Sequence, residues 1–333
     1  MKSRSQIVPR ILDVLRRSKT VALVSHVRPD GDSIGSQLAL AEALDRAGKS
    51  VVCWNEDPIP AKLAFLDRRG VIQSPCSDKR FDCVVALDAA SLERLGSVAD
   101  RIRDRSILIN IDHHISNTRF GDINWISHRN PSTGELVFRL LKASKWPITA
   151  TMADCLFTAV STDTGSFQYP STRPATYAVA GELVKRGANL ATICQEVYQS
   201  FPLSRVRLIQ HTLNNFKLTD HNRIAYFWLR PADYARARAG SDDSEGLIDH
   251  IRAIEPVVVA CLFEQMKPNL VRISMRSKNP RVDVNEIARQ FNGGGHPAAA
   301  GARIAGSPEA VQRAVIRAIR QALKSVPMNH ADS

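Results

Sequence analysis

Short apolar runs alternate with helical patterns through the first half of the chain. The runs "TVALVS", "SVVCW", "FDCVVALD" and "SILINID" have the length of buried strands, and a helical pattern covers about residues 33–46. "STGELVFRLLKAS" begins with the spacing of a capping box, and in "TMADCLFTAVSTDTG" apolar residues recur at i, i+3, i+4 and i+7, so both segments predict helices, the second ending near Asp163. This alternation favours a mainly parallel sheet covered by helices on both faces.

The pattern changes in the second half. Residues 173–217 are helical almost throughout, and "RIAYFWL", "PVVVACLFEQ" and "LVRISMR" then predict strands. "SEGLIDHIRAI", "VNEIARQF" and "PEAVQRAVIRAIRQAL" predict helices. We therefore predict an α/β protein with two lobes. The predicted parts are a larger domain, a helical connector, a smaller domain and a tail, at residues 1–187, 188–217, 218–326 and 327–333.

Composition narrows the setting of the protein. The 333 residues are 44% apolar, which gives room for two cores. The six cysteines stand singly without a CxxC pair, which argues against disulfides or a structural zinc site and favours a reducing cytoplasm. No apolar run is long enough to span a membrane, so we expect a soluble protein. The basic, amphipathic N-terminus resembles a transit peptide, but an apolar strand begins by Thr20, and we predict a docking helix instead.

Charge indicates an acidic partner. The formal net charge of +12 suits a nucleotide or a short nucleic acid. Residues 265–282 contain five basic residues and no acid. The alternative for this segment is a solvated edge strand that carries charge on its outward positions.

Titratable residues follow the predicted strands. His26 ends "VALVS", Asp88 ends "VVAL", and Asp112, His113 and His114 follow the next apolar run. Ligands of open parallel sheets bind outside the carboxyl ends of the strands, so we expect these side chains to converge. Asp30 and Asp32, in "VSHVRPDGDSIGS", and Asp163, just past a helix, should join them.

Such a cluster needs cations. Carboxylates about 5 Å apart repel by roughly 3 kcal/mol per pair at an effective dielectric constant near 20. Divalent ions remove that cost, and mixed imidazole and carboxylate ligands favour manganese, iron, cobalt or zinc over magnesium and calcium.

Each residue also has a purely structural interpretation when it is taken alone. Asp32 or Ser33 could be only a helix N-cap, and Asp88 could cap a helix at "AASLERL". His113 could be a hydrogen-bonded core residue, and Asp163 could shape the turn "TDTG". All of them together, in this order at strand ends, favour a metal site.

Four segments carry a family resemblance. "HVRPDGDSIGS", "ALDAAS", "NIDHHISN" and "STDTGSF" resemble the four successive motifs of the DHH phosphoesterase superfamily. "RSK" at 276–278 and "NEIARQFNGGGHPAAAGA" at 285–302 resemble its DHH-associated domain. The chain is similar to the small two-domain subfamily of nanoRNases and phosphoadenosine phosphate phosphatases. Asn292 replaces the first of the family's four glycines, and Asn tolerates a left-handed backbone better than other non-glycine residues.

The resemblance implies roles for individual residues. One metal would be held by His26, Asp30 and Asp88, and a second by Asp32, Asp88, His113 and Asp163. The two divalent ions, Mn²⁺ or else Co²⁺, would share a hydroxide that attacks phosphorus. The candidate catalytic residues are Asp88, which bridges the ions, His114, which contacts the phosphate or protonates the leaving group, and Asp112, which orients an imidazole. The candidate substrate-binding residues are Arg276, Ser277, Gly293, Gly294, Gly295 and His296, and the active site would lie between the lobes.

We therefore expect a manganese-dependent phosphoesterase. It would cleave RNA of about two to five nucleotides to mononucleotides, because no groove for an extended strand is recognisable. It would also convert 3′-phosphoadenosine 5′-phosphate to AMP. We expect it to act in the cytoplasm as a homodimer that does not bind a membrane. The alternatives are a phosphodiesterase for cyclic or linear signalling dinucleotides and a noncatalytic RNA-binding protein. A processive RecJ-like exonuclease and a pyrophosphatase fit the length and the "GGGH" segment less well.

Overall fold

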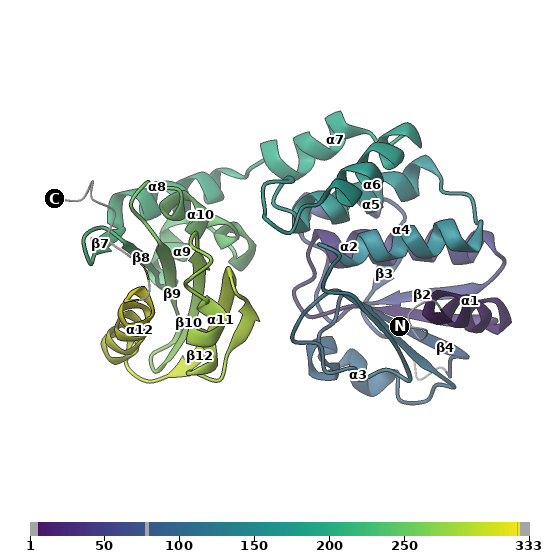
Figure 1. Cartoon of the computed structure of the whole chain (residues 1–333), viewed down its shortest axis with the longest axis horizontal. Helices are drawn as coiled ribbons and strands as arrows, with labels where there is room; N and C mark the ends of the chain where they lie inside the picture. Colours follow the sequence, from purple (N-terminus) through teal and green to yellow (C-terminus); the bar gives the residue numbers. More distant parts are fainter. Residues whose placement is uncertain (1–5, 77–79, 325, 327–333) are drawn as a thin grey trace. The chain divides into compact units, whose positions relative to one another are not determined.

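The computed structural model describes residues 6–76, 80–324 and 326. These residues form two compact units that divide between Ser200 and Phe201, and each unit can be followed by its colours in Figure 1. The division falls within the segment that the sequence predicts as a helical connector. The exact domain borders stay a prediction, and the predicted tail at 327–333 lies outside the described residues.

The first unit is built on a parallel sheet. Its strands lie in the order β3-β2-β1-β4-β5-β6, and every neighbouring pair is parallel, as predicted. The order runs outward from β1 in one direction and continues from β4 in the other, so a topological switch point lies between β1 and β4. The strands are β1 (Thr20–Val24), β2 (Ser50–Trp54), β3 (Ile72–Gln73), β4 (Cys83–Leu87), β5 (Leu108–Asp112) and β6 (Ile123–Ile126).

Helices cover both faces of this sheet. Val21 and Leu23 of β1 join one core cluster, whereas the alternate residues Ala22 and Val24 join another, as the two-residue period of a strand requires. The predicted N-terminal docking helix is confirmed as α1, which buries Ile11 among others. The helices are α1 (Ile7–Arg17), α2 (Gly31–Arg46), α3 (Val98–Arg101), α4 (Thr133–Ser144), α5 (Ala150–Asp163), α6 (Pro174–Lys185) and α7 (Leu190–Cys194), with a π-helical turn at Gln195–Gln199 and 3₁₀ turns at Ala61–Leu66 and Leu92–Leu95.

Close packing of α2 on α5 fixes the segment that follows β1. A Cβ atom on Gly31 would collide with the side chain of Thr162, and one on Gly35 would collide with the backbone carbonyl of Cys155. Glycine at these two positions lets the helices approach. The first turn of α2 is thereby held at the carboxyl end of β1, where the polar residues begin.

The second unit contains a mixed sheet in the order β11-β12-β10-β9-β8-β7. Only β8 and β9 pair in parallel. Its predicted strands and helices are confirmed. The strands are β7 (Lys217–Thr219), β8 (Ile224–Leu229), β9 (Val259–Lys267), β10 (Leu270–Ser277), β11 (Gly294–His296) and β12 (Ala299–Ala305), and the helices are α8 (Leu203–Asn215), α9 (Pro231–Ala237), α10 (Leu247–Arg252), α11 (Val284–Arg289) and α12 (Pro308–Leu323). Helices α8, α9 and α10 share a core on one face, and α11 and α12 share a core on the other.

The basic segment 265–282 lies largely inside this sheet. Strand β10 pairs with both β9 and β12, so the edge-strand alternative is wrong. Arg272 forms an ion pair with Glu264, its neighbour on β9, and Lys278 donates to the backbone carbonyl oxygens of Ile254 and Glu255. Part of the local positive charge is therefore used within the fold.

None of the helices in the described ranges combines the length and the apolar character that a bilayer crossing needs.

All six cysteines are free thiols, and four of them are buried.

Candidate metal centre

The polar residues predicted in the first unit meet at the switch point of its sheet. His26 lies just beyond β1, Asp88 just beyond β4, and Asp112 ends β5. Three groups of side chains there place their ligand atoms within 4.8 Å of one another. The groups are His26, Asp30 and Asp88; Asp32, His113 and Asp163; and Asp88, Asp112, His113 and His114.

His26 presents one ring nitrogen to two carboxylates. Its Nε2 lies 3.4 Å from Asp88 Oδ2 and 3.8 Å from Asp30 Oδ1. The other nitrogen, Nδ1, lies 2.9 Å from the carbonyl oxygen of Val27, which can only accept a hydrogen bond. Arg94 Nη2, which can only donate, also lies 3.2 Å from Nδ1, so the two contacts of this nitrogen favour opposite tautomers. With the proton on Nδ1, the Nε2 lone pair would be directed at the carboxylates, where a metal ion would sit.

Asp30 combines two tasks. Its Oδ1 accepts from the backbone amides of Asp32 and Ser33, each at 3.1 Å, and the Ser33 hydroxyl accepts from the Asp30 amide at 2.9 Å, which completes a capping box. The N-cap of α2 is therefore Asp30, and the alternative that Asp32 or Ser33 serves only as this N-cap is wrong. The alternative for Asp88 is wrong as well, because Ser91 holds the N-cap position of the next 3₁₀ turn.

His113 gathers the second group. Its Nε2 lies 3.1 Å from Asp163 Oδ2, 3.5 Å from Asp88 Oδ1 and 3.8 Å from Asp32 Oδ2. Asp163 is the last residue of α5, so the helix end places it beside the imidazole. The ends of β5 and α5 thus bring His113 and Asp163 together beside Asp32 and Asp88.

The N-terminus of α4 holds two of the carboxylates. The backbone amides of Thr133 and Gly134 donate to Asp32 at 2.6 and 2.7 Å, and the Thr133 hydroxyl donates to Asp88 Oδ1 at 3.1 Å. The first amides of a helix have no partner within the helix, and the helix dipole there favours negative charge. Sequence reasoning located this helix start from Ser132 and Glu135, but it did not identify Thr133 as a contact of the cluster.

Asp112 organises the third group. Its side chain is fully buried, and its Oδ1 lies 2.8 Å from His114 Nδ1. Asn117 donates to its other oxygen at 2.6 Å and to Asn110 at 2.8 Å. His114 keeps 28% of its side chain exposed, so it is the histidine of the cluster that solvent reaches most. Asn117, which sequence reasoning also missed, was visible as the last letter of "NIDHHISN".

Asp88 adopts an uncommon backbone conformation. Its φ is +58°, in the left-handed region that non-glycine residues rarely occupy. Strained backbone of this kind persists where surrounding contacts determine it, and it clusters at functional sites. Asp88 contacts His26, His113 and Thr133 from this position, which makes it the centre of the cluster.

The electrostatics show that the cluster suits a cation. Burial, together with the charges of Asp88 and Asp163, raises the pKa of Asp32 well above its usual range. Burial and the charges of Asp88 and Asp30 raise the pKa of Asp163 to about 7, against the opposing effect of His113. These carboxyl groups resist ionisation beside one another. A buried cluster of carboxylate oxygens and imidazole nitrogens fits divalent ions, which would neutralise the charge of the carboxylates.

The predicted substrate residues lie in the second unit. Arg276 and Ser277 end β10, and the Ser277 hydroxyl donates to the carbonyl oxygen of Asn279, so it holds the turn that follows. Asn292 has φ of +57°, which confirms that it can keep the left-handed shape of the glycine loop. His296 ends the short strand β11.

The three glycines of this loop are not equivalent. A Cβ atom on Gly293 or Gly295 would collide with the backbone of β12, so these two glycines permit strand packing. Gly294 has open space around it, with only Asn285 nearby. An anion could therefore approach the backbone at Gly294.

Comparison with known proteins places these features in a family. The model described as "DHH family, N-terminal domain" matches residues 20–160, and the "DHHA1 domain" model matches residues 223–325. The chain is 34% identical to the bifunctional oligoribonuclease and PAP phosphatase NrnA of Thermus thermophilus over 306 residues, which cover 91% of this chain and 90% of the relative. It is 28% identical to the NrnA of Bacillus subtilis, with 86% and 89% covered.

A solved structure is also similar. A crystal structure of an exopolyphosphatase-related protein from Bacteroides fragilis superposes with a TM-score of 0.88 at 29% identity, and the match covers 95% of this chain and 96% of that one.

Proposed function

Because this chain belongs to the DHH family of phosphoesterases, we propose that it is a metal-dependent hydrolase of short RNA. It degrades oligoribonucleotides of about two to five nucleotides to mononucleotides, because the candidate phosphate grip is the compact set of Arg276, the 293–295 loop and His296. It also removes a phosphate from 3′-phosphoadenosine 5′-phosphate to give AMP. The observation that carries the proposal is the meeting of three ligand groups at the switch point, in a chain similar along most of its length to proteins named for both activities.

We assign the metal-holding residues by these groups. His26, Asp30 and Asp88 would hold one divalent ion, and Asp32, Asp88, His113 and Asp163 would hold a second, with Mn²⁺ preferred and Co²⁺ as a substitute. When bound, such ions neutralise the carboxylates, polarise a phosphate and lower the pKa of a water that attacks phosphorus. Nitrogen ligands from two histidines support manganese over magnesium.

The protein supplies the remaining steps through His114 and Asp112. His114 is partly exposed beside Asp88, so it can donate a hydrogen bond to a phosphate oxygen or a proton to the departing oxygen. Burial would lower the pKa of His114, but its contact with Asp112 and the charge of Asp88 raise it, which keeps a proton available. Asp112 is a positioning residue, because its carboxylate fixes the orientation of the imidazole.

The second unit would bind the substrate. Arg276 offers a planar guanidinium that suits a phosphate, and its Nη1 donates to the carbonyl oxygen of Met275, which steadies the side chain. Gly294 leaves the loop backbone open, and His296 stands at the end of the same loop. Gly293 and Gly295 keep the loop against β12, and Ser277 shapes the turn after Arg276.

One experiment tests the proposal directly. Purified protein with Mn²⁺ is incubated with a dinucleotide, a five-nucleotide RNA, phosphoadenosine phosphate, a cyclic dinucleotide and pyrophosphate, and mononucleotide and phosphate release are measured. We expect release from the first three substrates. Preference for the cyclic dinucleotide would favour the signalling phosphodiesterase, and RNA binding without any product would favour the noncatalytic alternative.

Assembly and location are part of the same proposal. We propose a cytoplasmic location, supported by six free thiols, which suit a reducing compartment. We also propose a homodimer, which the family resemblance implies. Sedimentation equilibrium that gives the mass of a single chain at micromolar concentration would contradict the dimer.

A further inference from the structure

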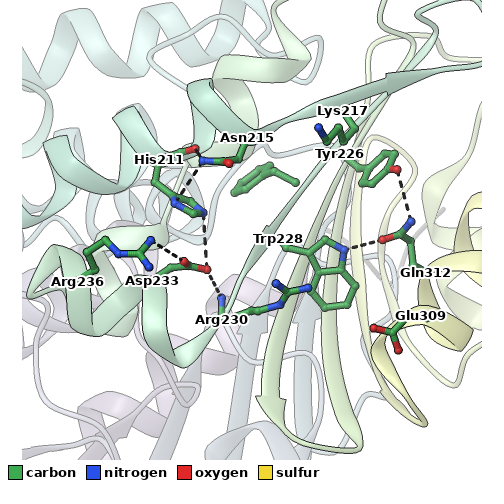
Figure 2. Close-up of a pocket in the computed structure, with 11 residues that line it drawn as sticks. His211, Asn215, Lys217, Tyr226, Trp228, Arg230, Asp233, Arg236, Glu309 and Gln312 are labelled. Atoms are coloured by element: carbon green, nitrogen blue, oxygen red, sulfur yellow. Dashed lines mark hydrogen bonds and ion pairs between the residues drawn. The ribbon is translucent and has the colours of Figure 1, made fainter.

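A cavity opens at one edge of the second sheet, away from the residues discussed so far. Its volume is about 550 Å³, which is within the range of small-molecule sites. Strand β7 pairs with β8 only from Ile224 to Tyr226, and the chain before Lys217 turns into α8. The edge of β8 beyond Tyr226 is therefore left without a strand from β7, and the cavity occupies that place between α8 and α9 on one side and α12 on the other (Figure 2).

An aromatic ring at the centre of the cavity is held in a fixed orientation. Trp228 stacks on Phe263, with ring centroids 5.0 Å apart and an interplanar angle of 20°. Its Nε1 donates to Gln312 Oε1 at 2.6 Å, and Gln312 in turn donates to the Tyr226 hydroxyl at 3.4 Å. The Arg230 guanidinium lies 5.7 Å from the ring centroid. The indole is thus a pre-formed stacking surface accompanied by a cation.

Charged groups surround this ring. On the α9 side, Asp233 already has partners, since Arg236 and His211 each lie 3.6 Å from it and the Arg230 backbone amide donates to it at 2.9 Å. Within the described part of the chain, no hydrogen bond or ion pair engages the ammonium of Lys217 or the carboxylate of Glu309. In Figure 2 these two side chains lie on opposite sides of Trp228.

We propose that this cavity binds a nucleotide as a second, noncatalytic site. The base stacks on Trp228 alongside the Arg230 guanidinium, the phosphate pairs with Lys217, and Glu309 accepts from an amino or hydroxyl group of the nucleoside. An anion alone would gain nothing from the fixed indole or from a free carboxylate. A planar base, hydrogen-bond donors and a phosphate together match all three features.

The site is separate from the predicted substrate residues of the same unit. The cavity lies at β8, whereas Arg276 lies on β10, two strands away, and His296 lies on β11, at the opposite edge of the sheet. Four strand spacings of about 4.8 Å separate β8 from β11, or about 19 Å. The nucleotide could arrive free in solution or as one unit of a single-stranded RNA, and both carry the same chemistry.

Calorimetry on the full chain distinguishes these sources. The protein is stripped of metal with EDTA and carries Arg276→Ala, which weakens the predicted substrate grip, and it is titrated with AMP, adenosine, inorganic phosphate and a five-nucleotide RNA. We expect Lys217→Gln to weaken AMP binding about tenfold, as loss of one charge-assisted contact does. Lys267→Gln, an exposed lysine on the same sheet outside the cavity, should change nothing.

The outcomes are separable from catalysis, because the assay measures binding without turnover. If Lys217→Gln weakens AMP binding, a free nucleotide suffices. If it weakens only RNA binding, the nucleotide must belong to a strand. Both results support the site. Trp228→Leu, checked for folding by thermal unfolding, should weaken the same ligands. Unchanged affinity for AMP and RNA in both cavity variants, or inorganic phosphate binding as tightly as AMP, would overturn the proposal.

Discussion

The two sheets of this protein gather their polar residues in different ways. In the first unit, acids and histidines come from the ends of parallel strands and meet at the switch point between β1 and β4. In the second unit, basic and aromatic residues surround a stretch of strand edge that lacks a neighbour. A parallel sheet brings the carboxyl ends of its strands to one edge, regardless of how far apart they are in sequence. A cavity at an open strand edge is instead lined by the helices that flank it. The first arrangement concentrates negative charge that suits metals, and the second leaves cations that suit anions.

The largest effect should come from replacing Asp88, the residue at the centre of the cluster in the first unit. We expect Asp88→Asn to lower kcat by more than about 10³-fold, because a metal ion contributes several kcal/mol of transition-state stabilisation. Asn suits the left-handed backbone at this position better than Ala does. Asp45→Asn, which changes an exposed acid on α2, should behave as wild type. Near-normal turnover and metal content in Asp88→Asn would refute the assignment.

A substitution in the second unit should weaken substrate binding and leave metal binding unchanged. Arg276→Ala would remove the proposed charge-assisted phosphate contact, worth about 1.5 to 3 kcal/mol, so kcat/KM for a dinucleotide should fall about 10- to 150-fold, with KM raised. Metal content, measured by elemental analysis, should not change. A wild-type protein that prefers a 24-nucleotide RNA to the dinucleotide, or unaltered dinucleotide kinetics in the variant, would place recognition elsewhere.

The choice of metal sharpens the picture of the first site. In the proposed centre, His26 and His113 would supply nitrogen ligands that magnesium accepts poorly, so activity with Mg²⁺ alone should be at least about tenfold below activity with Mn²⁺ or Co²⁺. The measurement is initial rate at saturating metal after removal of bound ions. Equal rates with Mg²⁺ and Mn²⁺ would indicate that the histidines are not ligands.

A smaller effect should follow from the support that α4 gives to the cluster. Thr133→Val removes the hydroxyl that donates to Asp88 while the backbone amides still hold Asp32. Metal affinity should fall about tenfold, at the low end of the range for residues that orient metal ligands. Thr133→Ser keeps the hydroxyl and should restore affinity. Equal affinities in the valine and serine variants would show that the hydroxyl has no such part.

The smallest effect is expected in the glycine loop, where alanine substitutions at Gly293 and Gly294 should differ in their effect on stability. Gly293→Ala should lower the free energy of unfolding by about 1 to 3 kcal/mol, because its Cβ would collide with β12. Gly294→Ala has room and should leave stability within about 0.5 kcal/mol. Denaturant unfolding of both variants measures the difference. If Gly294→Ala proves the more destabilising, the packing described for β11 is incorrect.

The sequence predicted the elements whose signals are local. Strands β1 and β4 are mostly apolar runs, and β5 is apolar apart from Asn110 and its terminal Asp112. The acids and histidines at the ends of these strands could be placed together because parallel strands end at one edge. Short strands such as β3, with two residues, and β11, which is mostly glycine, carry no periodicity to detect. The loop glycines illustrate the limit, because the same letters suit an anion site and close packing on β12.

Contacts that join distant segments were also beyond the sequence. Thr133 and Asp32 are 101 residues apart, and nothing near either residue specifies the partner. The cavity at β8 depends in the same way on Lys217, Trp228 and Glu309, which come from two strands and a helix that only the tertiary fold brings together. Local patterns fix the elements, whereas the packing of helices on sheets decides which polar side chains meet.

The grip of α4 on Asp32 has a consequence for amide hydrogen exchange. The first amides of a helix usually face water and exchange quickly, because the helix offers them no acceptor. Here the amides of Thr133 and Gly134 point into a buried carboxylate at 2.6 and 2.7 Å. Their protection therefore depends on an acid that the chain supplies from the first turn of α2. Deuterium uptake at these two amides reports the state of that turn, so occupancy of the cluster can be followed without a substrate and without turnover.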